Sequence, residues 1–83
     1  VKSSYSFSIL TPDSKGQVLR LAEIFNTEDV SLQQILQQGT DGKTARVVII
    51  THAVNKTQLE NVTRKLQATS GFKLLNTFKV LGE

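Results

Sequence analysis

A loop at residues 11–18, with the sequence TPDSKGQV, constrains the fold of this 83-residue chain more than any other stretch. Residues 3–10 before it alternate, with Tyr5, Phe7 and Ile9 on one side and serines on the other, the period-two pattern of a half-buried strand. Apolar residues after it recur at three- and four-residue steps, as in an amphipathic helix of about ten residues. These residues are Val18, Leu21, Ala22 and Phe25. The loop therefore joins a half-buried strand to a helix with one apolar stripe.

Two further strands are predicted after this helix. Residues 30–38 have the composition of a strand, but the parity of their apolar residues changes after Leu32, which indicates either a bulge or partial cover on both faces. Asp41 and Gly42 form a pair that is favoured in tight hairpin turns because it tolerates positive φ. Residues 44–51 (TARVVIIT) are rich in β-branched residues on both faces, which is typical of a central strand.

A second helix and a last strand complete the pattern. Asn55 is placed to cap this helix, and Gln58, three residues later, is placed to complete a capping box. Gly71 is the expected C-terminal stop of the helix. The large apolar side chains of the last strand, residues 72–81, share one parity. They are Phe72, Leu74, Phe78 and Val80.

The order strand, helix, strand, strand, helix, strand predicts an α+β fold. The expected form is a ferredoxin-like βαββαβ sandwich, with a four-stranded antiparallel sheet and two helices on one face. Right-handed crossovers place the first and third strands in the middle and the second and fourth at the edges. The second strand carries no charge, so nothing discourages it from pairing with a second copy of the chain. The residues expected on this dimer edge are Val30, Leu32, Gln34 and Leu36.

The length of the chain allows one domain, residues 1–83, because so short a chain has no room for two cores. The chain starts with VKSS rather than Met, so we interpret it as a piece excised from a longer protein. It contains no cysteine, which excludes disulfides, thiolate metal sites and cysteine nucleophiles and suits a cytoplasmic location. No apolar run approaches the roughly 20 residues that span a bilayer, and no signal peptide is recognisable, so no membrane partner is expected.

The residue types give little support for catalysis or for nucleic-acid binding. His52 is the only histidine and has no neighbouring carboxylates, so no metal site is expected, and Ser14 has no base beside it. The ten Lys and Arg residues give a formal charge of +3, but they are dispersed along the chain. The predicted third strand has no aromatic residue on which a base could stack, so an RNA-binding module of the same topology is the weakest alternative.

The loop itself is the strongest candidate for a site. Amide groups at the start of a helix lack intrahelical partners, and the helix dipole favours an anion there. A carboxylate could bond the amides of Gly16, Gln17 and Val18. Asp13 could hold an ammonium group, and an α-amino acid carries both groups. The alternative is that Asp13 and Ser14 only cap the helix and Gly16 only relieves a tight turn.

Two stretches carry a resemblance to a known family. The turn TPDSKGQVLRLAEIF is similar to a D-x-P-G-x-L motif that opens a helix, and VSLQQILQQG is similar to the strand that follows it. In both, and along nearly its whole length, the chain resembles an ACT domain, the small regulatory module of many enzymes of amino-acid metabolism. The run LQQILQQGTDGKTARVVIITHAVNKTQL is most similar to the C-terminal ACT domain of homoserine dehydrogenases. One departure is Lys15, which stands where the family usually has proline.

The resemblance implies that the chain is a sensor and not itself an enzyme. An amino-acid effector, expected to be threonine, would bind between the turn and the second strand of a partner in a homodimer. The implied effector-binding residues are Asp13, Ser14, Lys15, Gly16, Gln17, Val18, Ser31 and Gln33. The resemblance places no cofactor in this chain. It implies a catalytic domain in the same polypeptide that uses NAD(P) to reduce aspartate semialdehyde to homoserine. This reaction belongs to threonine and methionine biosynthesis. Lys15 keeps a second function open, a dimerisation module with no effector.

Overall fold

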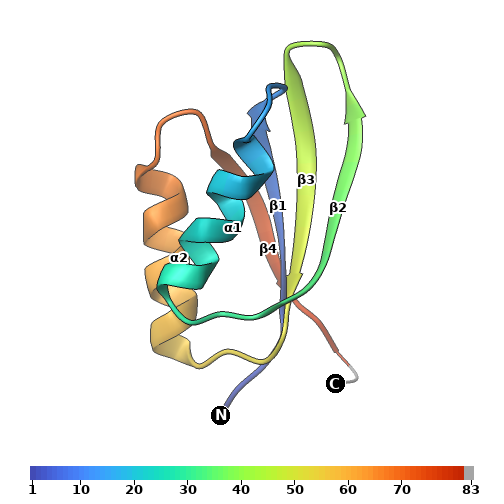
Figure 1. Ribbon diagram of the computed structural model, residues 1–83. Coiled ribbons are helices and arrows are strands. Elements are labelled where there is room, and N and C mark those ends of the chain that lie inside the picture. Colours follow the sequence, from blue (N-terminus) through green and yellow to red (C-terminus); the bar gives the residue numbers. More distant parts are fainter. Residues whose placement is uncertain (82–83) are drawn as a thin grey trace.

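Four strands and two helices follow one another in the predicted order in the computed structural model, which describes residues 1–81 (Figure 1). The elements are β1 (Tyr5–Pro12), α1 (Gln17–Thr27), β2 (Leu32–Thr40), β3 (Thr44–Thr51), α2 (Lys56–Ala68) and β4 (Lys73–Lys79). This order confirms the expected α+β fold of the ferredoxin-like type. Neither helix of this described part is long and apolar enough to cross a membrane.

The strands form one antiparallel sheet in the order β2-β3-β1-β4, so β1 and β3 are central and β2 and β4 are the edges, as predicted. Both helices lie on the same face of the sheet (Figure 1). β1 pairs with β3 from Ser6 opposite Ile50 to Pro12 opposite Thr44. The turn after β1, the β2–β3 hairpin and the loop before β4 therefore lie together at one end of the sheet, and the start of β1 and the end of β4 lie at the other end (Figure 1).

The core lies between the sheet and the helices, and it explains the alternation in β1. Phe7 and Ile9 are almost fully buried, and the Phe7 ring meets the ring of Phe25 edge to face, with 5.2 Å between the ring centres. The other buried members of this cluster are Leu21, Val30, Val47, Ile49, Val54, Val62, Leu66 and Phe72. The apolar stripe of α1 thus holds this helix, and the turn at its start, against the sheet.

The register of β2 shifts between Leu32 and Gln34, so the structure supports the bulge among the two alternatives that the change of parity left open. The strand starts at Leu32, so the prediction that Val30 lies on the edge strand was wrong. Val30 is buried in the core, and its amide donates to the Phe25 carbonyl at 3.1 Å. The reason is a sharp turn after α1, in which Asp29 has a φ of 58° and directs the next residue back under the helix.

A register shift in β4 contradicts the expectation that its large apolar side chains share one parity. Leu74 lies opposite Ile9, on the helix side of the sheet. Leu75 is then an extra residue in the pairing, and Phe78 lies opposite Ser6. Because Ser6 and Ile9 belong to opposite faces of β1, Phe78 lies on the face without helices. There it keeps 63% of its surface exposed.

The two ends of α2 differ in how well they were predicted. The capping box is confirmed: the Gln58 amide donates to Asn55 Oδ1 at 2.8 Å, and the Asn55 amide donates to Gln58 Oε1 at 2.9 Å. Gly71 does not stop the helix, which ends before it at Ala68. It turns the following loop with a φ of 94°, and a Cβ at this position would lie 3.6 Å from the Pro12 ring.

Candidate functional site

The turn between β1 and α1 is anchored to the neighbouring β2–β3 hairpin. The Asp13 amide donates to the Lys43 carbonyl at 2.9 Å. Within the hairpin, the Asp41 carboxylate accepts the amides of Thr44 at 2.8 Å and Lys43 at 2.9 Å. These hydrogen bonds hold the pKa of Asp41 below its ordinary value, and Gly42, with a φ of 89°, completes the predicted hairpin turn. The hairpin is therefore a fixed support for the turn.

Gly16 occupies the cap position of α1. Its φ is 87°, a left-handed conformation that suits glycine, and no side chain in the described part of the chain caps this helix. The alternative in which Asp13 and Ser14 cap α1 was therefore wrong, because the cap position falls beyond them on a residue without a side chain. The Ser14 hydroxyl instead accepts the side-chain amide of Gln17 at 3.1 Å.

The space in front of Gly16 is open. A Cβ at this position would meet no heavy atom within 4 Å outside its immediate neighbours. The first turn of α1 carries no acidic side chain that would compete for its amide groups. The start of α1 thus has open space beside Gly16 and no acidic side chain in its first turn, an arrangement that favours an anion such as a carboxylate.

Two cationic side chains accompany this helix start. Lys15 is exposed in the turn, and Arg20 follows one helical turn after Gly16, to whose carbonyl its amide donates at 3.1 Å. The Arg20 guanidinium donates to Gln17 Oε1 at 2.9 Å and lies 4.9 Å from the centre of the Phe72 ring. Sequence reasoning missed Arg20. Its spacing of four residues from Gly16 was the signal that could have found it.

The structure brings six of the predicted effector residues together and leaves two apart. The six lie in the turn and at the first two positions of α1. They are Asp13, Ser14, Lys15, Gly16, Gln17 and Val18. Ser31 and Gln33 lie near the start of β2, opposite Thr51 at the end of β3, whereas the turn lies beside Thr44 at the start of β3. An eight-residue strand spans about 25 Å, so one chain cannot bring both halves to a small ligand.

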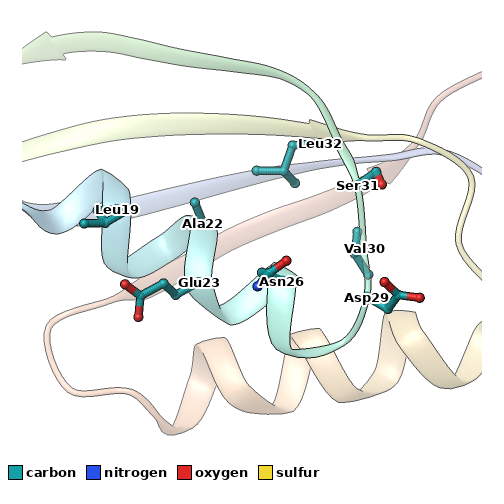
Figure 2. A pocket seen from close by; sticks show the side chains of 8 residues that line it. All are labelled: Leu19, Ala22, Glu23, Asn26, Asp29, Val30, Ser31 and Leu32. Carbon is teal, nitrogen blue, oxygen red and sulfur yellow. The ribbon is translucent and has the colours of Figure 1, made fainter.

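A groove of about 490 Å³ lies between α1 and the segment that leads into β2 (Figure 2). Its lining residues come from both walls. They are Leu19, Ala22, Glu23, Asn26, Asp29, Val30, Ser31 and Leu32. Figure 2 shows the α1 residues and Leu32 on opposite sides of this groove. Ser31 was predicted among them as an effector residue, and Val30 and Leu32 were predicted as dimer-edge residues. The α1 wall was missed because its helical spacing resembles that of the adjacent buried stripe.

β2 (Leu32–Thr40) is an outer strand of the sheet, and no charged residue occurs in it. Gln34 and Leu36 are exposed on this strand, whereas Leu32 is half-buried against the core. Ile35 and Leu36 keep 39% and 43% of their surface exposed. The strand thus offers unpaired backbone groups and apolar side chains without a charge that would oppose a further strand.

The described residues offer no obvious site for a metal ion. His52 is exposed, and residues 1–81 contain no group of three His, Cys, Asp or Glu side chains that could hold a metal ion. The chemistry available at the turn is therefore that of amide donors, two cations and one carboxylate.

Comparisons with known proteins show which family the chain is similar to. Residues 5–71 match the family model of the ACT domain. Homoserine dehydrogenase of Lactococcus lactis subsp. lactis (strain IL1403) is 54% identical over 83 residues, which are 100% of this chain and 19% of that relative. The chain thus spans about a fifth of the length of this relative.

Solved structures share the fold at low sequence identity. A homoserine dehydrogenase from Thiobacillus denitrificans has a TM-score of 0.74 and 12% identity over 96% of this chain and 17% of its own chain. The ACT domain from GTP pyrophosphokinase of Chlorobium tepidum has a TM-score of 0.64 and 16% identity over 96% of this chain and 100% of its own chain. The second structure shows that a chain consisting of such a domain alone adopts this fold.

Proposed function

Because the chain belongs to the ACT domain family, we propose that it is the amino-acid-sensing regulatory domain of a homoserine dehydrogenase. The Lactococcus lactis relative supports this proposal, since it carries that name and is 54% identical across the whole chain. The remainder of the parent polypeptide holds NAD(P) and reduces aspartate semialdehyde to homoserine. This chain contributes ligand sensing.

The open start of α1 is the observation that carries the proposal. An α-amino acid places its carboxylate on the amides of Gly16, Gln17 and Val18, where the helix dipole favours a negative charge. The Lys15 and Arg20 side chains add positive charge on the same side of the ligand. Threonine, an end product of the pathway that the parent reaction feeds, is the proposed effector.

A second copy of the chain completes the site. Two β2 edges that pair antiparallel about a two-fold axis place the start of one β2 beside the end of the other. The end of β2 lies at the same end of the sheet as the turn. Ser31 and Gln33 of the second copy are then the residues that approach the turn, and they supply hydroxyl and amide groups to the effector side chain.

This arrangement couples binding to assembly. A ligand held by two copies stabilises the pair, and by linkage the pair binds the ligand more tightly than one copy does. The parent enzyme responds only if its active and inactive states hold the two domains differently, since a ligand shifts an equilibrium only through its differential affinity.

Calorimetric titration of the isolated chain with threonine, and then with the other common amino acids, tests the proposal. We expect a saturable signal with threonine that Asp13→Ala weakens at least tenfold, because loss of a hydrogen-bonded charge typically costs about 1.5–3 kcal/mol. Glu60→Ala removes an exposed carboxylate on α2 and serves as the matched control. Absence of a signal with every amino acid, or unchanged affinity in Asp13→Ala, would contradict the proposal.

Lys15 favours a second candidate function, a dimerisation module without an effector. Proline at this position would preset the backbone for the helix start, and lysine does not. The mass of the chain in solution, measured beside the titration, separates the two functions. A dimer that binds no amino acid supports the second function, and a monomer at high concentration contradicts edge pairing in both.

A further inference from the structure

The face of the sheet that carries no helices has apolar side chains among serine, asparagine and glutamine residues. Residues that alternate with the buried ones point to it, and its apolar side chains include Phe78, Ile50, Val48, Leu36 and Leu10. Phe78 lies there because of the register shift at Leu75 in β4, and 63% of its surface is exposed. Neither helix covers this face (Figure 1). A large aromatic side chain in this position is costly to leave in water.

The charges on this helix-free face are all positive. Arg46 and Lys73 lie opposite Leu10 on its two sides, at the end of the sheet that holds the turn. None of the four strands contains an Asp or Glu residue. A second copy of the chain, with its formal charge of +3, would therefore bring like charges together on this face. The complementary surface is apolar opposite Phe78 and acidic opposite Arg46 and Lys73.

The chain ends also bear on what covers this face. The Val80 amide donates to the Ser4 carbonyl at 2.9 Å, so the first and last strands run side by side close to Phe78. The start of β1 and the end of β4 lie at this end of the sheet, where Tyr5 pairs with Lys79 (Figure 1). The Lactococcus lactis relative has about four fifths of its length outside the matched part. A covalent connection that leaves from here keeps its neighbour at a high effective concentration beside Phe78.

From these observations we infer that the helix-free face docks onto the remainder of its own polypeptide, with Phe78 as the main apolar contact and Arg46 and Lys73 facing acidic residues. This inference rests on the proposed function, since it requires the longer parent enzyme. It gives two surfaces of the domain separate tasks. The turn and β2 bind the effector and the second copy, and the helix-free face connects the domain to the catalytic part.

Cysteine labelling tests the inference, because the chain has no cysteine of its own. Phe78→Cys is made in the isolated chain and in the full-length parent protein with its other cysteines replaced. Leu19→Cys is the matched control, since Leu19 on α1 is 64% exposed and Phe78 is 63% exposed. A face that is docked for nine tenths of the time reacts with a maleimide about tenfold more slowly. We expect this slowing at Phe78→Cys, and not at Leu19→Cys, when the full-length protein is compared with the isolated chain.

Three results would overturn the inference. Equal labelling rates of Phe78→Cys in the isolated chain and in the full-length protein would show that the face is not docked. Slow labelling already in the isolated chain, relieved by dilution, would assign the face to a second copy. Slow labelling that appears only when single-stranded RNA is added would assign it to nucleic acid. The amino-acid titration reports binding at the turn and not at this face. Failure of the effector proposal would therefore not change the labelling result.

Discussion

The two helices of this domain start in opposite ways. At α2, Asn55 and Gln58 exchange hydrogen bonds that satisfy two amide groups of the helix end. At α1 the cap position is Gly16, in a left-handed conformation and with open space before it. One helix start is closed by its own side chains, and the other is left open to solvent.

The difference separates a structural helix start from one that is suited to a ligand. Gln58 at the closed start also donates to the carbonyls of Glu28 and Asp29, at 3.1 and 3.3 Å, and so ties α2 to the loop after α1. The open start makes no such tie through a side-chain cap. Under the proposed function, the effector carboxylate takes the place that Asn55 and Gln58 fill in α2.

The largest effect on stability is expected from Gly16→Ala. A side chain at this φ of 87° costs about 1–2 kcal/mol, and the cost is conformational because nothing lies within 4 Å of the new Cβ. Urea unfolding at fixed protein concentration measures the loss. Gly39→Ala is the control, since Gly39 also has open space but no positive φ, and its stability should be unchanged or slightly raised. Equal effects of the two substitutions would contradict the assigned cap geometry.

Asn55→Ala should lower the free energy of unfolding by about 1 kcal/mol, because it removes the acceptor for the Gln58 amide. Amino-acid binding at the turn should not change. A loss of ligand affinity as large as that of Asp13→Ala would show that the closed helix start also serves the ligand, and it would end the contrast between the two starts.

A smaller, pH-dependent effect on stability is expected from Glu28→Gln, at the contact between the end of α1 and α2. Glu28 forms an ion pair with Lys65 at 2.6 Å and accepts the Asn61 side-chain amide at 2.9 Å, and these contacts lower the pKa of Glu28. A lowered carboxyl pKa stabilises the folded state above the ordinary value, about 4.3, and this contribution is lost as the pH falls through the lowered value. In thermal unfolding, the Tm of Glu28→Gln should therefore be lower than that of the wild type at pH 7, and the two Tm values should become equal in acid. Glu60→Gln, which changes an exposed carboxylate, is the control. A Tm difference between wild type and Glu28→Gln that does not change with pH would contradict the role of the ion pair.

The smallest effect is expected from Ser14→Ala. Ser14 accepts one exposed hydrogen bond from Gln17 and caps nothing, so stability should change by no more than about 0.5 kcal/mol. Urea unfolding again provides the measurement. A loss comparable with that of Asn55→Ala would mean that Ser14 is a true cap after all.

Much of the fold could be predicted because its signals are local. The alternation around Phe7 and Ile9 and the capping box at Asn55 are readable from neighbouring residues. The bulge near Leu32 was visible as a change of parity. The position of Phe78 was not predictable in this way, because it depends on how β4 pairs with β1 across the sheet.

The candidate site was predicted in outline but not in its detail. The turn was found because Pro12 and Gly16 interrupt two clear periodicities. The cap assignment to Asp13 and Ser14 failed because cap propensity does not say which residue takes the cap geometry. Arg20 was missed because its relation to Gly16 and Phe72 is made by the folded helix and the distant loop before β4.

Amide chemical shifts of the isolated chain, recorded by NMR during a titration with threonine, test whether the open start of α1 binds the effector. We expect the largest shifts at Gly16, Gln17 and Val18, and unchanged shifts for the amides of residues 56–58 at the closed start of α2. No shifts at saturating threonine, or shifts centred on residues 56–58, would contradict this expectation.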